Sequence, residues 1–196
     1  MDGLPPRPFV FLRHGETFHN RVRLIAGCLD VPLTPRGEEQ ARAARPLLDR
    51  VTWSCVAVSP MFRARKTARL AVSTGPLYCY ADLRERHWGC WENQPIREPM
   101  PYFEHPRSGE SWEAFRDRVG GALTRVLNEF ECPLVVAHSG VFRVIRALTQ
   151  GSPLGPRVGN VEPILCRPPD EESARWRLEP LTAALLGELP CPRAVV

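Results

Sequence analysis

FVFLRHGE, residues Phe9 to Glu16, is the stretch that decides the fold. Its first four residues form a continuous apolar run, as expected of a strand that is buried on both faces of a parallel sheet. Arg13 and His14 follow directly, so a cation and an imidazole stand at the carboxyl end of this strand. Open α/β sheets bind ligands at that edge. The stretch therefore predicts an α/β fold with an anion site after an early strand.

A second apolar run, Leu134 to Ala137, also ends in a histidine, His138, which Ser139 follows. The carboxyl ends of parallel strands meet at one edge of a sheet, so two such strands would bring their histidines to the same place. We therefore expect one pocket that contains both His14 and His138.

The rest of the chain alternates short apolar runs with helical patterns. Thr34 and Ser111 are good helix N-caps, and Pro35 suits the first helical position. Further strands are expected at 55–58 and 77–80, helices from 35, over 62–72, from 111 to about 127 and from 141, and a terminal hairpin at 164–166 and 176–178. This order predicts a mainly parallel central sheet flanked by helices on both faces.

Composition excludes several classes of protein. The 196 residues include 26 Lys and Arg against 22 Asp and Glu, a net charge of +4 without a basic run, which argues against a nucleic-acid partner. No apolar stretch is long enough to span a membrane, and residues 1–6 do not resemble a signal peptide. The 7 cysteines contain no C-x-x-C pair, which fits a reducing compartment, and we expect a cytoplasmic protein.

The motifs together resemble the histidine phosphatase superfamily, in its phosphoglycerate-mutase-like branch. The first is Arg13-His14-Gly15-Glu16-Thr17 with Asn20, and four more follow in order over Phe9 to Arg146: 33–37, 59–63 with 67–68, 83–85 with 89 and 91–92, and 109–111. The resemblance implies a phosphoglycerate-mutase-like fold forming a single domain over 1–196. It also implies a short proline-rich lid at about 93–110 and leaves an irregular tail at about 180–196.

The resemblance implies a metal-independent phosphatase that hydrolyses phosphate monoesters through a phosphohistidine on His14. Such chemistry needs a nucleophile, cations for the phosphate oxygens and a proton donor for the leaving group. A neutral imidazole is nucleophilic, so His14 suits the first role. Arg13 and Arg63 suit the second, because guanidinium forks match phosphate oxygens.

His138 is expected to donate a hydrogen bond to the phosphate. Glu85 is the expected general acid, because it matches the family's acid in Leu83-Arg84-Glu85. Its competitors are Glu16, Glu92 and Glu110. Asn20, the Gly27 backbone and Ser139 are expected as further phosphate contacts, whereas Ala26 and Asn93 depart from the family's usual residues.

No metal or cofactor is expected, since the five histidines show no zinc-binding spacing. The expected partner is a small phosphorylated metabolite as substrate, and the sequence leaves the oligomeric state open. Arg97, His105 and Arg107 lie in or beside the lid and are candidates either for contact with a second anionic group of the substrate or for a solvated loop.

Two other functions stay open at this point. A phosphoglycerate-type mutase would use the same core, and a non-catalytic phospho-ligand or protein-binding module could share the fold. Between Trp91 and Gly109 the chain has 17 residues, four of them proline, too short and broken for the helical insertion expected of a mutase. The presence of every catalytic group disfavours a non-catalytic module.

Overall fold

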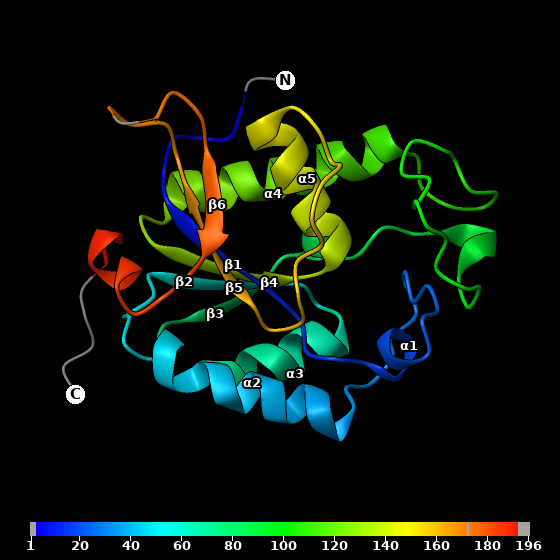
Figure 1. Cartoon of the computed structure of the whole chain (residues 1–196), viewed down its shortest axis with the longest axis horizontal. Helices are drawn as coiled ribbons and strands as arrows, with labels where there is room; N and C mark the ends of the chain where they lie inside the picture. The colour runs from blue at the N-terminus through cyan, green and yellow to red at the C-terminus, as the bar shows by residue number, and fades with distance from the viewer. Residues whose placement is uncertain (1–2, 172, 192–196) are drawn as a thin grey trace.

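The structure is a computed structural model that describes residues 3–171 and 173–191. Its centre is a six-stranded sheet with the order β3-β2-β4-β1-β5-β6 (Figure 1). The strands are β1 (Phe9–Arg13), β2 (Cys55–Val58), β3 (Leu77–Cys79), β4 (Pro133–Ala137), β5 (Pro163–Arg167) and β6 (Arg177–Pro180). Strands β1 to β4 are parallel, and β5 and β6 pair antiparallel at one side. The predicted mainly parallel α/β fold is confirmed.

Helices cover both faces of the sheet (Figure 1). The helices α2 (Pro35–Leu48) and α3 (Phe62–Ala71) lie on one face, and α4 (Trp112–Glu129) and α5 (Ser139–Gln150) lie on the other. Strand residues alternate between the two faces: Phe9 and Phe11 belong to the apolar cluster with α4 and α5, whereas Val10 and Leu12 belong to the cluster with α2 and α3. This two-sided burial explains the continuous apolar runs of the strands.

The predicted helix starts are also present. The Thr34 hydroxyl accepts a hydrogen bond from the Gly37 N–H at 3.0 Å, and the Ser111 hydroxyl accepts one from the Ala114 N–H at 3.1 Å. The sequence patterns did not predict four short elements of three or four residues, which carry no detectable period: α1 (Phe18–Arg21) and the 3-10 helices η1 (Ala81–Leu83), η2 (Gly89–Trp91) and η3 (Leu185–Glu188).

The tail is more ordered than expected. Within it, η3 and the buried residues Leu181, Leu186 and Leu189 pack in the cluster of α2 and α3. Cys191 forms a disulfide with Cys132, a pairing that the cysteine pattern did not predict. Residues 192–196 of the expected tail lie outside the described residues. None of the described helices is both long and apolar enough to cross a membrane.

Strand register brings three strand ends to one edge of the sheet. Arg13 of β1 pairs with Ala137 of β4, and Val58 of β2 pairs with Val136. The next residues, His14, Ser59 and His138, therefore follow at the same edge, and the His14 N–H donates to the Ala137 carbonyl at 3.0 Å.

Candidate active site

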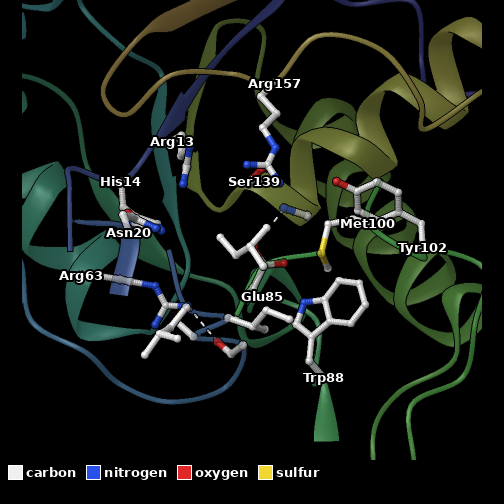
Figure 2. Close-up of a pocket in the computed structure, with 16 residues that line it drawn as sticks. Arg13, His14, Asn20, Arg63, Glu85, Trp88, Met100, Tyr102, Ser139 and Arg157 are labelled. Atoms are coloured by element: carbon white, nitrogen blue, oxygen red, sulfur yellow. Dashed lines mark hydrogen bonds between the residues drawn. The ribbon is translucent and has the colours of Figure 1, made fainter. Parts of the chain in front are cut away.

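The two histidines lie against each other at this edge. Their ring centroids are 5.2 Å apart, and the rings are inclined by 60°. His14 lines a cavity beside the sheet edge together with Arg13, Arg63 and Glu85 (Figure 2). His138 is fully buried and is not among the residues that line this cavity.

The environment of His14 selects one form of its ring. Its Nδ1 lies 2.8 Å from the Gly15 carbonyl oxygen. Because a carbonyl can only accept, Nδ1 carries the proton and Nε2 keeps its lone pair. Burial, and then the charges of Arg63 and Arg13, hold the pKa of His14 well below its ordinary value, against the opposing effect of the Gly15 bond. The imidazole is therefore neutral at physiological pH and has a free nucleophilic nitrogen.

Arg13 and Arg63 differ in how much of each guanidinium is already engaged. Arg13 donates through Nη1 to the Val158 carbonyl at 3.0 Å, and burial lowers its pKa to about 10, so it keeps its charge at neutral pH. Arg63 donates through both terminal nitrogens, to the carbonyls of Leu29 at 2.7 Å and Gly27 at 2.9 Å. Arg63 thus positions the loop around Gly27 and retains only its remaining N–H groups for a phosphate.

Three predicted phosphate contacts line the cavity: Asn20, Gly27 and Ser139. The Asn20 side-chain oxygen accepts bonds from the Thr17 N–H and from Asn160, so its NH₂ group is the end suited to an anion. Gly27 has φ +51°, and a Cβ there would lie 2.2 Å from a Glu92 carboxylate oxygen, so only glycine fits. Ser139 is the first residue of α5, where the helix dipole favours negative charge.

His138 has a hydrogen-bond partner within the protein rather than a place in the cavity wall. Its Nε2 lies 2.7 Å from the Ser59 hydroxyl, and its buried Nδ1 has no partner among the described residues. Burial, and then Arg63 and His14, hold its pKa well below the ordinary value. A direct bond from His138 to phosphate therefore stays a prediction.

Among the four candidate acids, only Glu85 lines the cavity. Its Oε1 accepts the Arg86 N–H at 2.8 Å, and its Oε2 accepts the Gly140 N–H at 3.0 Å, at the start of α5. These two bonds hold the carboxyl group in one orientation.

The three competitors are occupied by structural interactions. Glu16 accepts from the Thr34 hydroxyl at 2.7 Å and pairs with Arg21, and these contacts lower its pKa, which is the wrong direction for an acid. Glu92 accepts the N–H groups of Cys28 and Trp88. Glu110 pairs with Arg118 at 2.6 Å, and none of the three lines the cavity.

The lid contributes apolar residues to the cavity rather than the predicted charged ones. Ile96, Met100 and Tyr102 line it, whereas Arg97, His105 and Arg107 do not. Arg97 stacks on Trp91 with its guanidinium carbon 4.4 Å from the ring centroid, and His105 bonds to the Gly109 carbonyl at 3.2 Å.

Sequence reasoning missed two polar residues of the segment between α5 and β5. Arg157 lines the cavity opposite Glu85 (Figure 2). Asn160 donates to the His14 carbonyl at 2.8 Å and to Asn20. Both lie in a proline-rich stretch without a local pattern, so no sequence signal marked them.

A family model matches the part of the chain that carries most of these residues. The model of the histidine phosphatase superfamily (branch 1) matches residues 9–158. The chain belongs to the histidine phosphatase superfamily.

Known members of this superfamily are similar over most of the chain. The adenosylcobalamin/alpha-ribazole phosphatase of Escherichia coli K12 is 34% identical over 159 residues, covering 72% of this chain and 78% of that protein. The metal-independent phosphoserine phosphatase of Arabidopsis thaliana is 32% identical over 169 residues, covering 74% and 70%. The solved structure of mycobacterial glucosyl-3-phosphoglycerate phosphatase with VO3 has a TM-score of 0.74 at 25% identity and covers 90% and 99%.

Proposed function

We propose that this histidine phosphatase hydrolyses small phosphate monoesters through a phosphohistidine on His14, without a metal ion or cofactor. The observation that carries the proposal is the state of His14 in the cavity. Its Nδ1 proton is committed to the Gly15 carbonyl, and its Nε2 has no hydrogen-bond partner in the described part of the chain. His14 shares the cavity with Arg13, Arg63 and Glu85.

The reaction has two balanced steps. In the first, Nε2 of His14 bonds to phosphorus as the ester P–O bond breaks, and Glu85 gives its proton to the departing oxygen. Arg13, and the remaining N–H groups of Arg63, stabilise the charge on the non-bridging oxygens. In the second, the Glu85 carboxylate takes a proton from water as the water oxygen bonds to phosphorus. The bond between phosphorus and Nε2 breaks, which releases phosphate and neutral His14.

The test is to trap the intermediate. Enzyme quenched during turnover should carry phosphate that is acid-labile and alkali-stable, as a phosphoramidate is. His14→Ala should carry none and should lose activity by about 10³-fold or more, because nucleophile and surroundings act as one unit. The control is His105→Ala, which changes an exposed histidine outside the cavity. Full activity of His14→Ala would overturn the proposal.

The cavity wall supports a substrate with an apolar body. Beyond the polar residues, the wall is formed by apolar and aromatic side chains: Leu24, Ile25, Trp88, Ile96, Met100 and Tyr102. Arg157 adds a cation, suited to a second anionic group. Relatives named for alpha-ribazole phosphate and glucosyl-3-phosphoglycerate support a small phosphorylated metabolite of this kind.

The variant Arg157→Ala tests the role of the cation separately from that of the apolar wall. We expect KM to rise about 10-fold for esters that carry a second anion, the worth of one charge-assisted hydrogen bond, and to stay unchanged for aryl monophosphates. Equal changes in KM for the two classes of ester would show that Arg157 does not select substrates with a second anion.

A mutase is the second candidate function, because it would use the same residues. The segment 93–110 holds turns and bends and no helix, so it offers little enclosure for an intermediate that must rebind. Incubation with 3-phosphoglycerate, with and without 2,3-bisphosphoglycerate, should yield inorganic phosphate. Formation of 2-phosphoglycerate faster than hydrolysis of every monoester tried would assign a mutase instead.

A further inference from the structure

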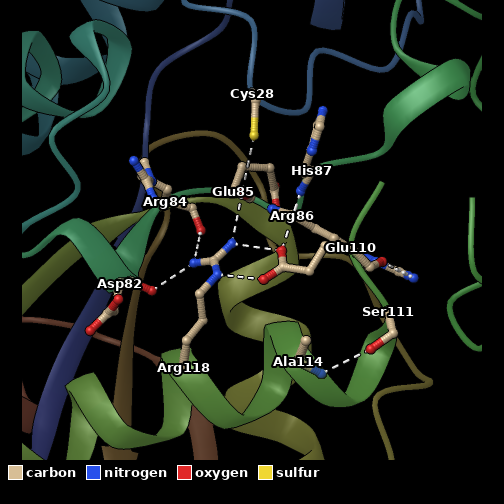
Figure 3. A network of polar contacts seen from close by, with 10 residues as sticks. All are labelled: Cys28, Asp82, Arg84, Glu85, Arg86, His87, Glu110, Ser111, Ala114 and Arg118. Atoms are coloured by element: carbon tan, nitrogen blue, oxygen red, sulfur yellow. Dashed lines mark hydrogen bonds and ion pairs between the residues drawn. The ribbon is translucent and has the colours of Figure 1, made fainter. Parts of the chain in front are cut away.

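Three metal-ligand side chains meet beside the phosphate cavity without lining it: Cys28, His87 and Glu92. Their ligand atoms all lie within 4.8 Å of one another, and His87 Nε2 is 3.9 Å from Glu92 Oε1. Cys28 and His87 are exposed and line a neighbouring hollow that also contains His105, so an ion can reach them from solvent. Figure 3 shows Cys28 and His87 next to the segment of Glu85.

The donor set is one sulfur, one imidazole nitrogen and one carboxylate oxygen. This mixture suits Zn²⁺, which takes these three ligand types, and disfavours Mg²⁺ and Ca²⁺, which prefer oxygen alone. Glu92 is already oriented, because its Oε1 accepts the N–H groups of Cys28 at 2.9 Å and Trp88 at 3.0 Å. Hydrogen bonds of this kind, from surrounding groups to the ligand side chain, hold a metal-binding carboxylate in its orientation.

The cluster is connected to the catalytic residues on two sides. Glu92 packs against Gly27, which lines the cavity and whose carbonyl is held by Arg63. The Cys28 sulfur lies 4.0 Å from the carbonyl oxygen of Glu85. An ion that draws Cys28, His87 and Glu92 together would therefore shift both the loop of Gly27 and the segment that carries the acid.

We propose that Cys28, His87 and Glu92 form a binding site for Zn²⁺ and that its occupation inhibits the phosphatase. Three protein ligands leave the fourth tetrahedral position to water. The ion displaces the thiol proton to solvent and takes no part in phosphoryl transfer. The binding part stands on the cluster alone, and the inhibition part rests on the proposed function.

The binding test uses the full chain after treatment with EDTA. Titration with Co²⁺, a spectroscopic substitute for Zn²⁺, should produce a thiolate-to-cobalt charge-transfer band that saturates at one ion per chain and disappears when Zn²⁺ is added. Cys28→Ser should abolish the band and weaken Zn²⁺ binding by at least about 100-fold, since even outer partners of a metal site are worth about 10- to 100-fold. The matched control is Cys79→Ser, which changes another exposed cysteine, on β3.

Activity supplies the second arm. Zn²⁺ should inhibit the wild-type enzyme and Cys79→Ser, EDTA should restore them, and Cys28→Ser should keep its basal activity at the same Zn²⁺ concentration. The site is refuted if the cobalt band is absent or if Cys28→Ser binds Zn²⁺ as tightly as the wild type. Binding without inhibition would refute the coupling to catalysis. If no phosphatase activity is found at all, the cobalt band still decides the site, so the two proposals fail separately.

Discussion

Two titratable histidines at the strand ends are buried, which disfavours their charged form. His14 is 4% exposed and His138 is fully buried, and both lie near the cations Arg13 and Arg63. Such surroundings favour the neutral imidazole, which is what a nucleophile needs. The same surroundings make the fold sensitive to acid.

We expect the free energy of unfolding to fall as the pH drops below about 6.5, the pKa of an unfolded histidine. Burial, then Arg63, hold the pKa of His14 and of His138 well below that value, so the unfolded chain binds more protons than the folded one. Each histidine should contribute up to about 1.4 kcal/mol per pH unit, until the pH falls through its folded pKa. Urea unfolding between pH 7 and pH 5.5 measures this slope.

His14→Gln should reduce that slope, whereas His105→Gln, at an exposed position, should keep it. An equal slope in wild type and His14→Gln would mean that other groups govern the acid sensitivity.

Glu85→Gln should affect substrates according to their leaving group. An alkoxide needs a proton as it leaves, so alkyl phosphates should lose about 10²- to 10⁴-fold in kcat/KM, whereas nitrophenyl phosphate should lose far less. Steady-state kinetics on both substrates, with Glu16→Gln as control, measures the difference. Equal losses for the two substrates would assign the acid to another residue.

At the scale of elements, two arginines, the half-buried Arg118 and the buried Arg86, join the segment of Glu85, the lid and α4 (Figure 3). Arg118 of α4 donates to the carbonyls of Asp82, Arg84 and Glu85 and pairs with Glu110. Arg86 is fully buried and donates to the carbonyls of three lid or lid-flanking residues: Tyr102, Glu104 and Glu110. Irregular segments lack the regular backbone hydrogen bonds of helices and strands. Here the guanidinium groups donate hydrogen bonds to their carbonyls instead.

Arg86→Met should destabilise the protein by about 3 kcal/mol, because it removes four hydrogen bonds to the half-buried or exposed carbonyls of Tyr102, Glu104 and Glu110. Arg84→Met, at the exposed neighbouring position, should stay within about 0.5 kcal/mol of the wild type. Urea unfolding measures both variants. Similar stabilities would show that the lid does not depend on the Arg86 bonds.

At the scale of the whole molecule, the tail adds buried leucines to the apolar cluster that lies between the sheet and the helices α2 and α3. Leu186 and Leu189 are buried there, and the disulfide from Cys191 to Cys132 spans 59 residues of sequence. Closing a loop of this length stabilises a fold by up to about 4 kcal/mol, mainly through the unfolded state.

A reducing agent should therefore lower the melting temperature of the wild-type protein. The melting temperature of Cys191→Ser, which lacks the disulfide, should not change. Cys79→Ser, which keeps the disulfide, should respond like the wild type. Thermal unfolding with and without dithiothreitol measures the effect. An unchanged melting temperature of the wild-type protein after reduction would show that the disulfide adds no stability.

The sequence by itself determined the features that depend on near neighbours. Continuous apolar runs marked β1, β2 and β4, because two-sided burial leaves no polar position in such strands. Thr34 and Ser111 marked helix starts, since a cap acts within three residues. The histidines and arginines were found because each directly follows or adjoins such an element.

Only the tertiary structure decided what depends on residues that are distant in the chain. It shows that Glu85, already expected as the acid from the resemblance, lines the cavity, whereas Glu16, Glu92 and Glu110 contact other partners. Packing also placed Arg157 in the cavity and brought Cys28 to His87 and Glu92, across 59 and 64 residues of sequence. Such encounters carry no local period or spacing, because they are set by how whole elements pack against the sheet.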